Sequence, residues 1–353
     1  MLTKINEYRR VLTKTLTKNI GNSYKNPTID LSEKVEIKRV LICRPNHRLG
    51  NLLLITPFVQ EISSTFPDCK IDLFVKGGLG PIIFKNYKNI NAIIELPKKP
   101  FKNLLQYFSV WVKLKKECYD IIINIEKGSS SGRIATQFAD AKYKFFGKAD
   151  HEINARYKDY DHIAKYPIYD FRLFLTKLGF KNNVGPIPSL NLKLSTSEIA
   201  EGKKLLDAIV SNEKKTICIF TFATADKCYS ESWWEEFYEK LKKEFEINYN
   251  IIEVLPVENI SQIGFKAPTF YSTDIREIGS LITNTTLFIG ADSGIMHLSS
   301  AVNTTTIGLF SRANQNMYEP YNNNSLAINT NNSSIDESIK IINSILINKQ
   351  INL

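Results

Sequence analysis

The stretch FIGADSGIMHLSSAVNTTTIGLFS, residues 288–311, contains two apolar runs separated by a segment of helical character. The first run ends at Asp292, and the second follows a segment that holds His297. A strand, a helix and a strand in this order form a βαβ unit, in which the two strands are parallel. The stretch therefore predicts an α/β fold.

The same alternation extends through the chain in two blocks. Short β-branched runs such as IKRVLICR and YDIIINI alternate with longer helical runs, and the rhythm restarts after the Pro- and Gly-marked NNVGPIPSLNLKLS. We expect two Rossmann-like, doubly wound parallel-sheet domains that face a central cleft, where the carboxyl ends of both sheets bind ligands. The expected divisions are an N-terminal arm over residues 1–36, a first domain over 37–190 and a second domain over 191–353.

Length, apolar runs and cysteine spacing together exclude several classes of protein. A chain of 353 residues can bury two cores, and no apolar run approaches the roughly 18 residues that span a bilayer. The five cysteines are scattered and odd in number, which favours reduced core thiols over disulfides, and no CxxC pair predicts a metal site. The first twenty residues lack the apolar core of a secretory signal. We therefore expect a cytoplasmic protein without a bound metal.

The formal charge of +10 indicates a polyanionic partner: nucleic acid, a phosphorylated substrate or an anionic membrane surface. No compact basic and aromatic module is present, so we do not expect nucleic acid binding. Helical spacing in the N-terminal arm places apolar residues on one face among basic ones, and such a helix can lie on anionic lipid. Docking on the protein's own surface, or a frayed tail, explains this pattern equally well. The basic residues are Lys4, Arg9, Arg10, Lys14 and Lys18, and the apolar residues are Leu2, Ile5, Tyr8, Leu12 and Leu16.

The turn at Asp292, Ser293 and Gly294 is a candidate anion site. Asp and Ser are favoured helix N-caps, and the free N–H groups of a helix N-terminus attract an anion such as a diphosphate. A plain cap is the alternative. Placement at the end of a strand in a basic two-domain chain favours phosphate binding.

Three segments resemble glycosyltransferase family 9, the ADP-heptose:lipopolysaccharide heptosyltransferases. ADSGIMHLSSAVNTTTIGLF resembles the family signature Asp-Ser/Thr-Gly-x-x-His-x-x-x-Ala, and RLGNLLLITPFVQEISSTFPDCKIDLFV looks like its N-terminal Leu-Gly-Asp-x-Leu-Leu-x-Thr-Pro block. TFATADKCYSESWW is similar to the segment whose lysine contacts the donor phosphates. The resemblance implies a GT-B fold and inverting transfer without an obligatory cofactor. It further implies a nucleotide-sugar donor such as ADP-heptose and a lipid-linked saccharide acceptor at the inner face of the cytoplasmic membrane.

The resemblance also assigns donor-side residues. Lys227 would neutralise the donor diphosphate, while Ser293 and Gly294 would offer it a hydroxyl and backbone donors. These contacts would stabilise the charge that develops on the leaving group. His297 lies one turn inside the helix, so we expect it to pack rather than catalyse. The remaining donor-side candidates are Thr221, Thr224, Asp226, Glu258 for the ribose, Asp292 for the turn or the acceptor, and His297 itself.

The N-terminal block departs from the family at one position. The family places its general-base aspartate after Leu-Gly, and this chain has Asn51 there. An amide can position the acceptor hydroxyl but cannot take its proton. His47 in the same loop is the nearest alternative base, because histidine titrates near neutrality. The acceptor-binding candidates are Arg44, Arg48 and Gly50, the arginines because guanidinium groups pair with carboxylate or phosphate.

The departure leaves several functions open. Another group serves as base, or orientation by Asn51 suffices in a dissociative transition state, or the chain binds nucleotide-sugar or glycan without turnover. A nucleotide-sugar epimerase would need acid/base carboxylates that the matched blocks do not supply. A dinucleotide oxidoreductase would need GxGxxG after the first strand, where RPNHRLGN stands instead.

Overall fold

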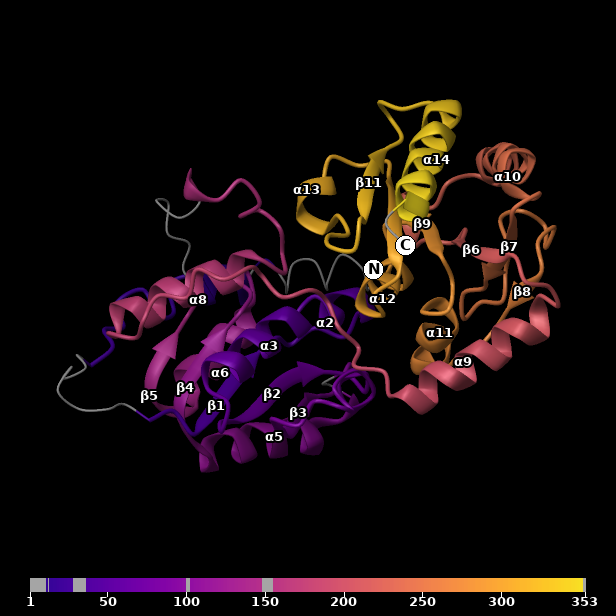
Figure 1. Ribbon diagram of the computed structural model, residues 1–353. Coiled ribbons are helices and arrows are strands. Elements are labelled where there is room, and N and C mark those ends of the chain that lie inside the picture. Colours follow the sequence, from indigo (N-terminus) through magenta and orange to yellow (C-terminus); the bar gives the residue numbers. More distant parts are fainter. Residues whose placement is uncertain (1–10, 12, 28–35, 100–101, 148–154, 352–353) are drawn as a thin grey trace. The chain divides into compact units, whose positions relative to one another are not determined.

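The computed structural model divides the chain into two compact units, each with its own sheet (Figure 1). The structure describes residues 11, 13–27, 36–99, 102–147 and 155–351. The first unit runs to His47 and from Pro57 to Pro188, and the second comprises Arg48–Thr56 and Ser189–Leu353. Each unit is an α/β structure, as the alternating pattern predicts.

The first unit contains a five-stranded parallel sheet in the order β3-β2-β1-β4-β5. The central strand β1 pairs in parallel with both neighbours, so that Val40 lies opposite Ile71 on one side and Ile121 on the other. Because helices cover both faces of the sheet, its central strands read as continuous apolar runs. The strands are β1 Arg39–Cys43, β2 Lys70–Lys76, β3 Ile90–Leu96, β4 Cys118–Asn124 and β5 Asp140–Phe145.

Helices cover both faces of this sheet. The chain moves from β1 outward through β2 to β3 and then crosses back to β4, and right-handed crossovers place the two sets of connecting helices on opposite faces. Val110 of α5 and Ala135 of α6 pack on Leu41, whereas Phe58 of α3 packs edge-on against Phe171 of α8 at 5.3 Å between ring centroids. The helices are α3 Thr56–Thr65, α4 Gly80–Ile83, α5 Leu104–Lys116, α6 Ser130–Phe138 and α8 Tyr166–Lys177.

The described part of the N-terminal arm is docked on the first unit. The Thr17 hydroxyl donates to Ser130 Oγ at 2.8 Å, and Arg133 Nε donates to the Thr17 carbonyl at 2.8 Å. Leu16, on the predicted apolar face, is 73% exposed. Over residues 13–27, docking on the protein's own surface is therefore the alternative that the structure shows, because polar contacts hold the segment. Residues 1–10 and 12, with most of the predicted apolar face, lie outside the described residues.

The second unit contains a six-stranded parallel sheet in the order β11-β10-β9-β6-β7-β8. Trp234 of α10 and Ile342 of α14 pack on Ile217 and Ile307 on one face. Met296 of α12 lies against Gly308, and thus on the opposite face, because neighbouring strand residues point to opposite faces. The strands are β6 Lys215–Phe220, β7 Tyr249–Val254, β8 Thr269–Phe270, β9 Leu287–Ala291, β10 Thr305–Phe310 and β11 Leu326–Asn329. The helices are α9 Thr196–Ile209, the 3₁₀ turn η2 Ala225–Lys227, α10 Glu231–Phe245, α11 Ile275–Ile282, α12 Gly294–Ala301, α13 Gln315–Tyr318 and α14 Ile335–Ile351.

One segment groups differently from the expected domain division. The short helix α2, Leu49–Leu53, packs against α12 and so belongs to the second unit, although the sequence division places it in the first domain. Gly50 allows this approach, because a Cβ atom there would lie 2.6 Å from His297 Cδ2. Alternation of strands and helices cannot reveal such a grouping, since it depends on a contact between segments more than 200 residues apart.

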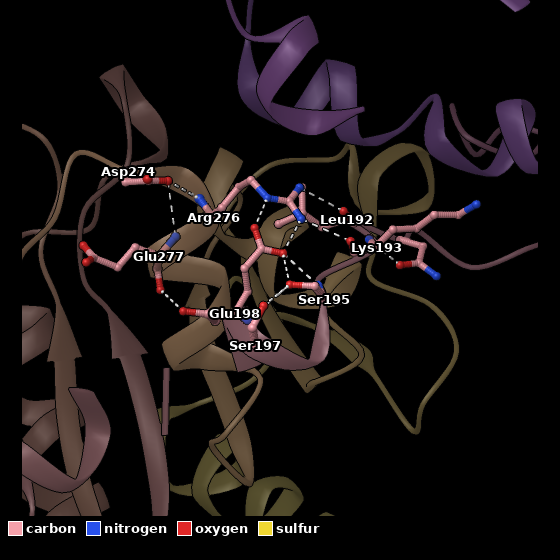
Figure 2. Close-up of polar contacts among 10 residues, drawn as sticks. Leu192, Lys193, Ser195, Ser197, Glu198, Asp274, Arg276 and Glu277 are labelled. Carbon is pink, nitrogen blue, oxygen red and sulfur yellow. Dashed lines mark hydrogen bonds and ion pairs between the residues drawn. The ribbon is translucent and has the colours of Figure 1, made fainter. Parts of the chain in front are cut away.

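A buried ion pair fixes the beginning of the second unit. Figure 2 shows the Arg276 guanidinium between the Glu198 carboxylate, at 2.6 and 2.9 Å, and the carbonyls of Leu192 and Lys193, each at 3.1 Å. Ser195 caps α9 and forms a capping box with Glu198, so the same carboxylate serves the helix terminus and the guanidinium. The network thereby ties the chain before α9 to α11.

We expect this network to make the second unit sensitive to acid. The hydrogen bond from Arg276 lowers the pKa of Glu198 far below its usual value. A lowered folded-state pKa contributes stability above the unfolded pKa of about 4.3, and this stability is lost as the pH falls further. Glu198→Gln should cost about 3 kcal/mol at pH 7, because it leaves a buried guanidinium unpaired. Urea unfolding should show this difference shrinking toward pH 3.

The exposed pair of Glu201 with Lys204 provides the matched control. Glu201→Gln should change the free energy of unfolding by less than about 0.5 kcal/mol at either pH, because exposed ion pairs contribute little. A difference between Glu198→Gln and the unmodified protein that stays constant from pH 7 to pH 3 would contradict the assigned role of the carboxylate.

Candidate functional site

The candidate donor site lies at the carboxyl ends of neighbouring strands in the second unit. Strands β10, β9, β6 and β7 are adjacent in the sheet, so the segments that follow them meet at one edge. Ligands of open parallel sheets bind at this edge. Asp292 follows β9 and Thr221 follows β6 directly, and Lys227 lies six residues beyond Thr221, in η2.

Lys227 and Asp292 form an ion pair at this edge. Lys227 Nζ lies 3.1 Å from Asp292 Oδ2, and Asn314 Nδ2 donates to the same oxygen at 3.3 Å. The aspartate is buried while the lysine is about one-quarter exposed, so the ammonium group is held in place yet remains accessible. A fixed, accessible ammonium at the edge of the sheet suits the recognition of a phosphate.

Ser293 supplies the expected helix cap. Its hydroxyl accepts a hydrogen bond from the backbone N–H of Met296 at 3.2 Å, and α12 begins at Gly294. The first N–H groups of α12 therefore lie directly beside the Lys227–Asp292 pair along the chain. A helix N-terminus carries partial positive charge, which adds to that of the ammonium.

Two residues of this site were missed by the sequence interpretation. Arg312 and Asn314 follow β10 and, with Lys227, Asp292 and Ser311, line a surface depression. Arg312 forms an ion pair with Asp226. The available signal was their position after the second strand of the βαβ unit, since that strand ends at the same edge. The motif recognised in the sequence ends at Ser311 and therefore does not include these two residues.

Thr221 contributes to the site through a buried carboxylate. Its hydroxyl donates to Glu253 Oε1 at 2.5 Å and accepts from the Gln262 backbone N–H at 3.1 Å, while the Ser261 hydroxyl donates to Glu253 Oε2 at 2.6 Å. Burial raises the pKa of Glu253, and the two hydroxyl donors oppose that shift. Thr221 therefore fixes the loop after β7. Glu258 lies exposed in that loop, and Thr224 is exposed just before η2.

His297 is packed inside the second unit. Its ring is almost fully buried, lies against Gly50 of α2, and is 6.3 Å from the ring of Tyr318 between centroids. Burial lowers the pKa of His297 to about 4, with a smaller opposing contribution from Asp292. The imidazole is therefore neutral at pH 7. This buried position agrees with the expected packing role of His297. Donor binding by His297 stays a prediction.

The acceptor-side candidates occupy the segment that follows β1. Arg44 is buried in the first unit, where it forms an ion pair with Glu126, so it is not the exposed arginine that its loop position indicates. His47 and Arg48 are exposed, and Asn51 is partly buried in α2. Gly50 is buried against α12. Roles for these residues in binding an acceptor remain predictions.

The part of the chain that the structure describes contains neither a metal-binding cluster nor a membrane-spanning helix. Within it, no group of three or more His, Cys, Asp or Glu side chains is placed to hold a metal ion. No helix among the same residues combines the length and apolar character needed to cross a bilayer.

Comparison with known sequences shows a similarity to one family of enzymes. The model of glycosyltransferase family 9 (heptosyltransferase) matches residues 269–342, which include β9, the Asp292 turn, α12 and β10. The chain is thus similar to the heptosyltransferases of glycosyltransferase family 9. It is 24% identical over 294 residues to lipopolysaccharide heptosyltransferase 3 of Escherichia coli, covering 78% of this chain and 84% of that protein. It is also 24% identical over 294 residues to the lipopolysaccharide core heptosyltransferase OpsX of Haemophilus influenzae, covering 78% and 80%.

Solved structures confirm the predicted GT-B fold of this chain. The glycosyl transferase family 9 protein of Veillonella parvula superposes with a TM-score of 0.70 at 16% identity, covering 90% of this chain and 99% of that one. The ADP-heptose LPS heptosyltransferase II of E. coli gives a TM-score of 0.65 at 13% identity, covering 89% and 100%. At these identities the likeness establishes the fold alone.

Proposed function

We propose that this protein is a glycosyltransferase that transfers a heptose or related sugar, with inversion, from a nucleotide diphosphate donor such as ADP-heptose to a lipopolysaccharide-type acceptor. The carrying observation is the Lys227–Asp292 pair beside the N-terminus of α12. The Lys227 ammonium and the N-terminus of α12 both provide positive charge there. The diphosphate is the part of such a donor whose negative charge they would neutralise. The transfer takes place in the cytoplasm at the inner membrane face and requires no metal ion.

The reaction is a single displacement at the anomeric carbon. The acceptor hydroxyl oxygen forms a bond to this carbon from the face opposite the diphosphate, while the bond to the phosphate oxygen breaks. The nucleoside diphosphate leaves with the electron pair, and the hydroxyl proton passes to a base or to water. Lys227 and the N–H groups of α12 stabilise the charge that grows on the leaving group. Asp292 acts through Lys227 by holding its ammonium group in position.

The proton acceptor is the unusual part of this mechanism. Asn51 stands where the family has its aspartate and serves to orient the acceptor hydroxyl. His47 is exposed and lies four residues before Asn51, so it is the nearest side chain in sequence that can take a proton. Arg48, also exposed, contributes positive charge for an anionic acceptor sugar.

A second candidate function rests on the same departure. With an amide in place of the carboxylate, the chain binds a nucleotide sugar or a glycan without turning it over. The donor site around Lys227 is unchanged in this alternative, so donor binding alone does not separate the two functions. Measured transfer does.

The test combines donor binding with transfer. A panel of ADP- and UDP-sugars should contain one donor, with ADP-heptose expected, that raises the melting temperature by several degrees. A ligand at about 100 times its Kd contributes about 2.7 kcal/mol. With that donor and a delipidated core saccharide, nucleoside diphosphate release should be measurable, and His47→Ala should lower its rate about 10²-fold without changing the thermal shift.

Each alternative has its own outcome in these assays. Donor binding without release, together with release by Asn51→Asp, would establish the binding protein in place of the transferase. An unchanged rate in His47→Ala would remove this histidine as the base. If no sugar nucleotide raised the melting temperature, the donor-site assignment itself would be wrong.

A further inference from the structure

Helix α5 has two apolar faces, although only one of them is buried. Tyr107, Val110, Trp111 and Leu114 pack on the sheet of the first unit, at the spacing that forms one stripe of a helix. Figure 1 shows α5 running along the outside of this sheet, below β1, β2 and β3 in that view. The side of α5 that points away from the sheet should then be polar if it met only water.

The outward side instead carries exposed apolar side chains, beside the polar Ser109 and Lys116. Leu105, Phe108 and Val112 are 89, 62 and 53% exposed. At 100° per residue these three side chains fall within about 60° of one another and opposite the buried stripe. The exposed ring of Phe138, at the end of α6, lies beside the helix, 5.9 Å from the ring of Trp111. We name these exposed apolar side chains of α5 and of the end of α6 the α5 ridge.

Lysines lie in the last turn of α5 and in the segment before the helix. The helix sequence LLQYFSVWVKLKK contains no acidic residue, and its last turn holds Lys113, Lys115 and Lys116. Glu117, at the end of the helix, is paired with Arg39 at 2.6 Å, so its charge is compensated. The further exposed lysines before the helix are Lys98, Lys99 and Lys102.

We propose that the α5 ridge is the surface by which the protein rests on an anionic lipid bilayer. An apolar ridge with lysines nearby matches an interface of acyl chains and acidic headgroups, because each component meets its own counterpart. The helix has 13 residues and is therefore about 20 Å long, which suits lying in the interface rather than spanning the bilayer. The surface follows from α5 itself and would bring the proposed transferase to a lipid-linked acceptor.

The expected strength of binding follows from the two components. Each lysine near an anionic surface strengthens binding about fivefold, so the three lysines of the last turn contribute about 10²-fold. This part of the affinity falls with added salt, whereas the contribution of the inserted apolar side chains does not. Neutral vesicles should therefore bind the protein weakly, and anionic vesicles strongly at low salt.

The experiment measures co-sedimentation of the full chain with phosphatidylcholine vesicles containing 0 or about 30% phosphatidylglycerol. Leu105→Ser/Phe108→Ser/Val112→Ser and Lys113→Gln/Lys115→Gln/Lys116→Gln should each lower partitioning onto anionic vesicles at least tenfold. All six positions are exposed, so circular dichroism and the melting temperature should remain close to those of the unmodified protein. The matched control removes three exposed lysines of the second unit, Lys203→Gln/Lys204→Gln/Lys243→Gln, and should bind as the unmodified protein does.

Other surfaces give different results in the same experiment. If Lys14→Gln/Lys18→Gln abolished binding while both α5 variants still bound, the N-terminal arm would be the membrane surface and the proposal would be wrong. If the α5 variants converted a dimer to a monomer in sedimentation velocity without any effect on vesicle binding, the ridge would be a contact between copies of the chain. Absence of binding to anionic vesicles at low salt would also overturn the proposal.

Membrane binding and transfer can be separated. On a delipidated, water-soluble acceptor the α5 variants should keep the transfer rate of the unmodified protein, because α5 lies outside the donor site. Vesicle binding without transfer would contradict the proposed function and leave the ridge standing. Transfer without vesicle binding would contradict the α5 ridge as a membrane surface and leave the proposed function standing.

Discussion

Lys227→Ala should lower kcat/KM for sugar transfer by about 10² to 10³-fold. The ammonium group is a cation held at the edge of the second sheet, and removal of one preorganised donor to a developing anion costs this much in comparable sites. The donor-induced thermal shift should also shrink, because the diphosphate carries charge before the reaction as well. Steady-state release of the nucleoside diphosphate measures the first effect, and thermal unfolding measures the second.

Two companion variants make this result specific. Lys266→Ala removes an exposed, ion-paired lysine of the same unit and should leave kcat/KM unchanged. Asp292→Asn loses one charge-assisted contact of about 1.5 kcal/mol, or about tenfold in rate. If Asp292 acts through Lys227, the double variant should be no slower than Lys227→Ala alone. Multiplying losses would show that the aspartate contacts the substrate itself.

Gly202→Ala should destabilise the second unit by about 3 kcal/mol or more. In an ordinary helix interior this substitution stabilises by roughly 1 kcal/mol. In α9, however, the added Cβ would lie 1.9 Å from the backbone oxygen of Ser280 in α11. Backbone cannot move aside as a side chain can, so overpacking outweighs the gain in helix propensity. Urea unfolding should give a lower transition midpoint for the second unit.

A Gly→Ala substitution should not destabilise the protein where the structure leaves space for the added methyl group. A Cβ on Gly128 of the first unit would meet nothing within 4 Å, and its φ is not among the positive values. Gly128→Ala should therefore leave stability unchanged or raise it slightly, since it restricts the unfolded chain. Equal destabilisation by both substitutions would mean that the close approach of α9 to α11 is not the cause.

The local features of the fold and of the donor site could be predicted from sequence. Residues 288–311 form β9, α12 and β10 as expected, because apolar runs, a Ser cap and helical spacing all act within a few residues. Lys227 and Asp292 are 65 residues apart, yet their side chains meet at one edge of the sheet. Parallel strands explain this result, since all of them end at the same edge of the sheet and the residues that follow them meet there.

The features that escaped prediction depend on distant partners. Arg44 follows a strand as a ligand-binding residue would, but Glu126, 82 residues away, holds it in a buried ion pair. Asn314 binds Asp292 from beyond the recognised motif, and the grouping of α2 with α12 rests on the missing side chain of Gly50. No local pattern encodes such pairings, because each is set by the register and packing of complete units.

The docking of the N-terminal arm has a consequence for the edge of the first sheet. β5 is an edge strand, and its outer side would otherwise offer free backbone groups. Asn26 occupies it: its Nδ2 donates to the Lys144 carbonyl at 3.1 Å and its Oδ1 accepts from the Lys144 N–H at 2.7 Å. One amide side chain thus completes a peptide group as a neighbouring strand would. The segment around Asn26 therefore covers part of this sheet edge and hinders edge-to-edge association with other molecules. A chain shortened so that it begins at the first strand should be less soluble.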